Sequence, residues 1–159
     1  MYIKLGKIKR MINIYQPSLG KEELKAIEKV FKSNWIGKGN LTETFTKNLA
    51  TKLDVDRKNI ETCCSCTEAL FQSQPLLGIG EDDEVILPSV SFVGAANAII
   101  TAGAVPVFCD VDERKLSVTA KHIEEKITSK TKAVIVLHYG GWSCEMDEIL
   151  SLCKEKNIK

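Results

Sequence analysis

Residues 84–109 read EVILPSVSFVGAANAIITAGAVPVFC, and after Glu84 they carry no charged side chain. Such a stretch is long enough to cross a bilayer, but Pro88 and Pro106 interrupt it and polar side chains lie between them, so no membrane span is predicted. The pattern instead predicts a buried helix between two buried strands. The predicted elements are a strand over Glu84–Leu87, a helix over Phe92–Ala102 and a strand over Val105–Cys109.

The same alternation of strand, turn and helix continues on both sides of this stretch. Upstream, apolar residues at helical spacing (Leu24, Ile27, Val30 and Phe31) predict an amphipathic helix over Lys21–Ser33. Thr42 is expected to cap a second helix whose apolar face is Phe45, Leu49 and Leu53. The remaining predicted elements are a strand Ile60–Ser65, a helix Thr67–Leu77 that Pro75 should kink or end, a helix His122–Ile127 capped by Thr119, a strand Ala133–Leu137 and a helix Glu145–Lys156.

Strands that are apolar at every position are typical of parallel sheets covered by helices on both faces. The predicted fold class is therefore α/β, a three-layer arrangement with mostly parallel strands. No internal repeat interrupts this order, and the alternation calls for one more strand after Asn157–Lys159.

Length and charge narrow the functional classes. A chain of 159 residues with 44% hydrophobic and 27% charged residues is expected to form one folded domain. The net charge of +1 gives no general basic excess for nucleic-acid binding. Five basic residues and no acid fall within positions 1–21, so residues 1–20 are interpreted as a basic extension and entry segment. Their apolar positions are too interrupted for a signal peptide.

Six cysteines are present, and Cys63, Cys64 and Cys66 are clustered. A zinc site normally needs two ligand pairs, whereas this cluster has no second pair and the two histidines are far apart in sequence. No metal site is predicted. The favoured interpretation is a set of reduced, mostly buried thiols in a cytosolic protein.

Ligands of open α/β sheets collect at the carboxyl ends of the strands, and three such positions hold chemically useful residues. Ser65–Leu70 joins a strand to a helix, where free N–H groups suit a phosphate, although Ser65 or Thr67 could simply cap the helix. Pro88–Phe92 places an aromatic residue after the second strand, where a flat ring could stack or a core could form. His138–Gly141 combines a titratable side chain with two glycines that could serve only a turn.

Taken in order, these segments resemble the DegT/DnrJ/StrS sugar aminotransferases, which are fold-type I enzymes dependent on pyridoxal phosphate. The resemblance runs from about Ile14 to the last residue. The segments that carry it are Gln16–Ser18, Lys32–Gly39, Ser65–Leu70, Gly80–Pro88, Ser91–Val93, Asn97–Ile99, Gly103–Phe108, Asp110–Asp112, Ile127–Thr128, Thr131–Ala133 and His138–Gly140.

The resemblance implies roles for six residues. Cys66, Thr67 and Glu68 fall in the turn that grips the cofactor phosphate, and Phe92 is the aromatic that stacks on the pyridine ring. Trp35 and Gly37 lie in a loop near the sugar site or the partner subunit. The family usually has small residues where this chain has Cys66 and Glu68, and a carboxylate beside a phosphate is repulsive unless it points away.

The resemblance also implies a function. The chain is expected to be the N-terminal portion of an aminotransferase that moves an amino group, typically from glutamate, to a keto-sugar nucleotide. Such an enzyme is a cytoplasmic homodimer without nucleic-acid or membrane partners. Residues 21–159 would be the front part of its cofactor domain, because the aspartate that pairs with the pyridine nitrogen and the Schiff-base lysine have no counterpart in this sequence. A non-catalytic truncated product, a regulator and a sugar dehydratase relative remain alternatives.

Overall fold

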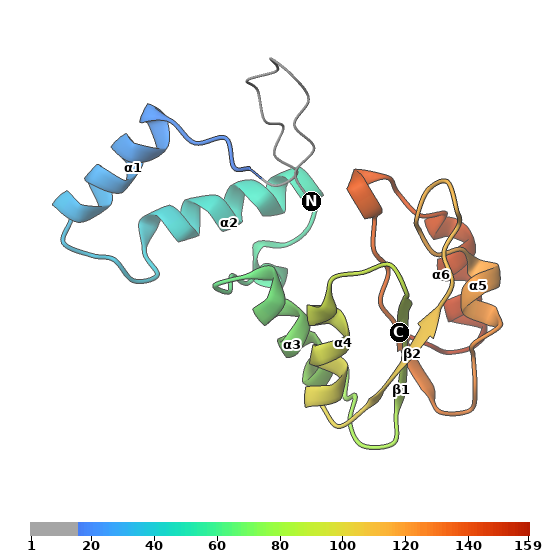
Figure 1. Cartoon of the computed structure of the whole chain (residues 1–159). Helices are drawn as coiled ribbons and strands as arrows, with labels where there is room; N and C mark the ends of the chain where they lie inside the picture. Colours follow the sequence, from blue (N-terminus) through green and yellow to red (C-terminus); the bar gives the residue numbers. More distant parts are fainter. Residues whose placement is uncertain (1–15) are drawn as a thin grey trace, which may run out of the picture. The chain divides into compact units, whose positions relative to one another are not determined.

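A computed structural model describes residues 16–159 of the chain, most of which form helices and parallel strands (Figure 1). These residues fall into two compact units, one that ends at Thr62 and one that spans Cys63–Lys159. The predicted basic extension 1–20 lies for the most part outside the described residues. Within the described residues, no helix combines the length and apolar character that crossing a membrane would need.

The second unit is built on a three-stranded parallel sheet in the order β2-β1-β3, which confirms the predicted α/β class. The strands are β1 (Glu84–Pro88), β2 (Val105–Cys109) and β3 (Thr131–Val134). Only β1 has a strand on each side. Its Val85, Ile86 and Leu87 are completely buried, as a central strand without alternation predicts.

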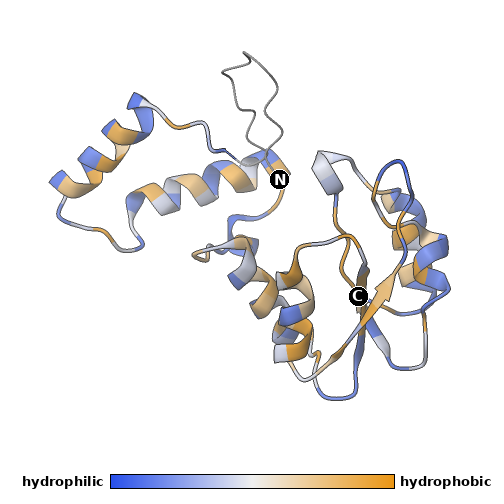
Figure 2. Cartoon of the chain, in the orientation of Figure 1, coloured by the Kyte–Doolittle hydropathy of each residue, from blue (hydrophilic) through white to orange (hydrophobic). Residues whose placement is uncertain are grey.

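Helices cover both faces of this sheet and make three layers (Figures 1 and 2). On one face, α3 (Cys66–Leu76) and α4 (Val93–Thr101) pack over a core that includes Leu87 and Ile99. On the other face, α5 (Ala120–Glu124) and α6 (Met146–Glu155) enclose a second core around Ile86. Figure 2 shows β2 and much of α4 in orange, as the apolar pattern of residues 84–109 predicts.

The prediction that every strand is buried on both faces is wrong for β2. Val105 and Phe108 are about half exposed, because β2 is an edge strand in the described sheet. Apolar runs alone do not distinguish a central strand from an edge strand, since both lie beneath a helix on at least one face.

The strand predicted over Ala133–Leu137 starts and ends earlier, at Thr131 and Val134. It starts earlier because the Thr131 hydroxyl oxygen accepts the Thr128 N–H at 2.9 Å and closes the turn before the strand. The Ile135 N–H still donates to Ile86 O at 2.8 Å, but the next donor on β1 would be Pro88, which has no N–H. The outer edge of β3 pairs with Lys159, whose N–H donates to Lys132 O at 2.9 Å.

The first unit contains α1 (Lys21–Lys32), α2 (Asn40–Leu53) and the short 3₁₀ helix η1 (Arg57–Asn59). Both long helices are confirmed, but Thr42 does not cap α2. Gly39 takes the N-cap position, and its carbonyl oxygen accepts the Glu43 N–H at 3.0 Å. None of the α1 residues is buried, so its apolar face is open in the described residues.

The strand predicted over Ile60–Ser65 is absent. Ile60 and Ser65 have extended backbone, but no described strand pairs with residues 60–65. The predicted helices 67–77, 92–102 and 145–156 agree with α3, α4 and α6 to within one residue at each end, and Thr119 caps α5 as expected. Pro75 lies in the last turn of α3, which ends at Leu76.

Two neighbouring isoleucines on α4 provide a matched test of this core. Ile99 is 0% exposed and Ile100 is 58% exposed. Ile99→Ala should lower the free energy of unfolding by about 2–5 kcal/mol, because it removes buried methyl groups and leaves a cavity. Ile100→Ala should change it by about 0.5 kcal/mol or less. Urea denaturation of both variants measures the difference, and equal losses would contradict the assigned face of α4.

Candidate functional site

The candidate site lies at the carboxyl end of the sheet in the second unit. The chain leaves β1 to form α4 on one face, and between β2 and β3 it forms α5 on the other face. Connections that leave in opposite directions leave a crevice beyond the strand ends, where ligands of open α/β sheets bind. In Figure 1, α3 and α4 lie side by side and both begin at this end of the sheet.

The start of α3 presents unpaired backbone donors. Ser65 is the N-cap, and its Oγ accepts the Glu68 N–H at 3.0 Å. The N–H groups of Cys66 and Thr67 come before the first intrahelical bond, which Ala69 donates to Ser65 O. No acceptor for either of them is found among the described residues. Both residues are exposed, so this turn can donate two hydrogen bonds to an anion.

Glu68 stands in the same turn but directs its carboxylate along the helix. Glu68 Oε1 accepts from Gln72 Nε2 at 2.8 Å, one turn further toward the C-terminal end of α3. This bond ties the negative charge to a residue away from the free N–H groups.

Phe92 is the N-cap of α4 and is 63% exposed at the loop that follows β1. Its ring lies over Gly94, because a Cβ added at Gly94 would come within 2.4 Å of Phe92 Cε1. Phe92 therefore presents a ring at the strand end, and Gly94 permits its position. The sequence analysis did not identify Gly94 as a site residue. The signal that could have identified it is a small residue two positions after an aromatic helix N-cap, because the ring then has room to lie over it.

His138, the third candidate at a strand end, orders its own loop. Its Nδ1 accepts the Cys144 N–H at 3.2 Å, and the Cys144 thiol donates to Leu137 O at 3.4 Å. Between them, Gly140 and Gly141 adopt φ values of 62° and 86° within the 3₁₀ helix η2 (Tyr139–Gly141). The two glycines thus supply the positive φ values that this turn needs, and His138 stabilises the turn by accepting the Cys144 N–H.

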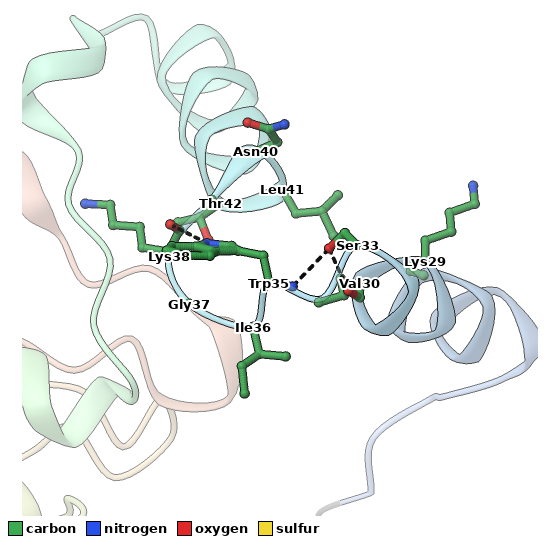
Figure 3. A pocket seen from close by; sticks show the side chains of 12 residues that line it. Lys29, Val30, Ser33, Trp35, Ile36, Gly37, Lys38, Asn40, Leu41 and Thr42 are labelled. Atoms are coloured by element: carbon green, nitrogen blue, oxygen red, sulfur yellow. Dashed lines mark hydrogen bonds between the residues drawn. The ribbon is translucent and has the colours of Figure 1, made fainter.

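Trp35 and Gly37 belong to the first unit, where the loop between α1 and α2 borders an open cavity of about 810 Å³ (Figure 3). The Trp35 indole Nε1 donates to Lys38 O at 3.1 Å and folds the ring back over its own loop. Val30 and Leu41 contribute apolar walls from the two helices. The two units are described separately, so the structure does not bring Trp35 and Gly37 together with Cys66, Thr67, Glu68 and Phe92.

An ion pair between Lys38 and Glu61 holds the end of this loop that precedes α2. Lys38 Nζ donates to Glu61 Oε1, and the Thr62 N–H reaches the same oxygen at 3.0 Å. These two donors, the Lys38 ammonium first, hold the pKa of Glu61 below its ordinary value. A carboxyl whose pKa is lowered in the folded state stays ionised at neutral pH, so the pair is lost only as the pH falls through that lowered value.

The cysteines divide into two groups. Cys109, Cys144 and Cys153 are buried, whereas Cys63, Cys64 and Cys66 are exposed, so the expectation of mostly buried thiols is wrong for half of them. The exposed three lie in the turn that leads into α3, which has no covering element in the described structure. Among the described residues, no group of three His, Cys, Asp or Glu side chains is placed to hold a metal ion.

Comparison with known proteins agrees with this arrangement. The family model of the DegT/DnrJ/EryC1/StrS aminotransferases matches residues 17–159. The chain belongs to this family. It is 51% identical over 148 residues to a dTDP-4-dehydro-2,3,6-trideoxy-D-glucose 4-aminotransferase from Saccharopolyspora spinosa, covering 93% of this chain and 38% of that protein. It is 37% identical to a GDP-perosamine synthase from Escherichia coli O157:H7, covering 94% of this chain and 41% of that protein.

Solved DegT/DnrJ/EryC1/StrS-type structures share the fold. The aminotransferase TlmJ from Streptoalloteichus hindustanus superposes with a TM-score of 0.90 at 51% identity, covering 93% of this chain and 40% of that one. The sugar aminotransferase Spr1654 from Streptococcus pneumoniae, in its PLP form, superposes with a TM-score of 0.79 at 25% identity over 91% of this chain and 36% of its own. The homologues are thus sugar aminotransferases, and this chain spans about two fifths of their length.

Gly39 allows a test of the Trp35 loop. A Cβ at Gly39 would meet Trp35 Cδ1 at 2.9 Å and Nε1 at 3.0 Å, so Gly39→Ser should push the indole off Lys38 O. Serine is a good N-cap, which keeps the start of α2 intact. In a Trp142→Phe background, acrylamide should quench Trp35 fluorescence more strongly in this variant.

Gly37→Ser is the matched control, because its Cβ would lie 3.7 Å from the same ring, an ordinary contact distance. It should leave the quenching unchanged. Similar quenching in all three proteins would show that the indole is not held against Lys38.

Proposed function

We propose that this chain supplies part of the cofactor and substrate site of a pyridoxal-phosphate-dependent aminotransferase that acts on keto-sugar nucleotides. The observation that carries the proposal is the start of α3, where the N–H groups of Cys66 and Thr67 are unpaired; the adjacent helix α4 has the exposed Phe92 as its N-cap. Membership in a family of sugar aminotransferases supplies the reaction class.

The residues of this chain fit the cofactor. A phosphate dianion accepts hydrogen bonds from the Cys66 and Thr67 N–H groups, and the N-terminal end of α3 favours its charge. The Thr67 hydroxyl is available as a third donor. Glu68 lies in the same turn. Its N–H stays bonded to Ser65 Oγ and its carboxylate to Gln72, so Glu68 donates no hydrogen bond to the phosphate and its carboxylate is held toward Gln72.

Phe92 provides a flat apolar surface for the pyridine ring at the edge of the same crevice. Stacking there keeps the ring in one plane and excludes water from one of its faces. When bound, pyridoxal phosphate supplies an electron sink for breaking the bonds at the amino-acid α-carbon. The NtdA protein of Bacillus subtilis, solved with bound PMP, is similar to 86% of this chain with a TM-score of 0.75.

The loop that contains Trp35 and Gly37 is proposed to contact the sugar-nucleotide substrate. The indole is 63% exposed although its Nε1 is bonded to the loop, so its position is fixed while a face remains free. Relatives named for dTDP- and GDP-linked sugars support a nucleotide sugar as acceptor, and glutamate is the proposed amino donor. Both substrates are cytoplasmic metabolites, and we place the reaction in the cytoplasm.

A homodimer is the proposed assembly. The exposed apolar side chains of Leu24, Ile27 and Phe31 form a stripe along α1 that has no cover in the described structure. Apolar faces of this kind are typical of protein interfaces. Sedimentation at tens of micromolar should show a dimer that Phe31→Lys weakens, and a monomer at that concentration would contradict the proposal.

Residues 21–159 are also proposed to be part of one cofactor domain.

Binding of pyridoxamine phosphate to the full 159-residue chain tests the cofactor site, because this amine forms no adducts with surface lysines. It should bind more tightly than pyridoxamine, which lacks the phosphate. Thr67→Pro should weaken binding about tenfold or more, because it removes one N–H and the hydroxyl. Phe92→Ala should weaken binding of both ligands. Equilibrium dialysis of the unaltered chain and the two variants with each ligand measures these six affinities.

Matched controls lie elsewhere on the same unit. Thr101 is exposed at the other end of α4 and Phe108 is half exposed on β2, so Thr101→Val and Phe108→Ala should leave both affinities unchanged. Proline is tolerated in the first turn of a helix, and circular dichroism checks that α3 persists. Equal affinity for the two ligands would contradict a phosphate site at Thr67.

Amino transfer is tested by a chimera in which this chain replaces the matching segment of TlmJ. We expect L-glutamate to convert bound pyridoxal phosphate to pyridoxamine phosphate in the chimera, as measured by absorbance and mass spectrometry. Thr67→Pro in the chimera should lower the rate at subsaturating cofactor. A chimera that folds and binds the cofactor but shows no conversion, alongside an active unaltered TlmJ, would contradict the proposed function.

A further inference from the structure

The six thiols of this chain differ sharply in their surroundings. Burial raises the pKa of the Cys109 thiol to about 11, and burial also raises the pKa of Cys153. These thiols remain protonated and enclosed at neutral pH, and Cys144 is buried with them. Cys63, Cys64 and Cys66 are all exposed within four residues of each other. Any reagent that attacks thiols in the folded chain therefore meets this cluster first.

Within the cluster, sequence spacing and one hydrogen bond distinguish Cys63 and Cys66 from Cys64. Cys63 and Cys66 have the C-x-x-C spacing, and the chain bends at Cys64 between them. The Cys63 Sγ donates to Ser65 O at 3.2 Å. That oxygen belongs to the peptide bond that joins Ser65 to Cys66, so the sulfur of Cys63 already lies beside the backbone of Cys66.

The rest of the turn keeps this arrangement in place. Ser65 is held as the N-cap of α3 through its bond from the Glu68 N–H, and Cys66 is the first residue of the helix. Cys64, at the apex of the bend, makes no side-chain hydrogen bond among the described residues. The hydrogen bond across this bend thus runs from the Cys63 thiol to the carbonyl that precedes Cys66, and Cys64 takes no part in it.

We propose that Cys63 and Cys66 form a dithiol site that hydroperoxides oxidise to a reversible intramolecular disulfide. One thiolate attacks the peroxide, the O–O bond breaks, and a sulfenic acid and water (or an alcohol) are formed. The second thiol attacks that sulfur, the S–S bond forms, the S–O bond breaks, and a second water leaves. Both protons of the dithiol end in water, and the peroxide receives the two electrons.

This disulfide would close a ring over the turn that carries the free N–H groups of Cys66 and Thr67. Its formation needs only the thiols and the peroxide and does not depend on the proposed cofactor. If the proposed function also holds, oxidation changes the backbone that binds the phosphate, and cofactor affinity becomes sensitive to the redox state of the chain.

The experiment treats the folded 159-residue chain with stoichiometric hydrogen peroxide, alkylates the remaining thiols and cleaves after glutamate. Cleavage after Glu61 and Glu68 releases residues 62–68, which contain all three exposed cysteines and none of the buried ones. We expect this peptide to lose two hydrogens and to carry one alkyl group, on Cys64. Dithiothreitol should restore three alkylation sites.

Three serine variants separate the pairings. Cys64→Ser should form the disulfide as readily as the unaltered chain, whereas Cys63→Ser and Cys66→Ser should lose it. Disulfide loss in Cys64→Ser, products that stop at sulfinic acid, or only intermolecular disulfides would each overturn the proposal. Because all three positions are exposed, the substitutions should leave the circular dichroism spectrum unchanged, which confirms that the variants are folded.

Discussion

Val85, Ile86 and Leu87 are completely buried in the middle of β1, and they connect the parts of the second unit. Their backbone pairs with β2 on one side and β3 on the other, and their side chains alternate between the two cores. A strand with neighbours on both edges and helices on both faces tolerates no polar side chain, because no water or partner would satisfy it. The helices of the second unit are positioned by this strand.

The same strand fixes where chemistry can occur. Because β1 is followed by a helix on one face and β3 is reached from the other face, the carboxyl end of the sheet opens between the two connections. The start of α3 and the ring of Phe92 are both carried to this end by helices that pack on the same face. Neither residue type identifies a cofactor site alone; the proposal that they hold a phosphorylated ring rests on their placement at one end of a parallel sheet.

The turn before α3 combines two kinds of reactivity in a few residues. Its N–H groups suit an anion, and its exposed thiols suit an oxidant, because both need an uncovered helix start. In a covered turn, the free donors and the thiols would both be shielded, as Cys109 is within the sheet. The exposure of this segment is therefore the physical condition on which both the proposed function and the dithiol site depend.

The sequence by itself determined the α/β class, the long helices and the cap at Thr119, since these follow from apolar periodicity and local hydrogen bonding. It also identified the family, through the order of short segments along the chain. Only the tertiary structure decided that β2 is an edge strand, that residues 60–65 are unpaired and that Pro88 ends the pairing with β3. Only the structure showed that Glu68 binds Gln72 and that the Cys63 thiol donates to the Ser65 carbonyl. Pairing and side-chain direction depend on neighbours distant in sequence or on rotamer choice, which residue patterns do not contain.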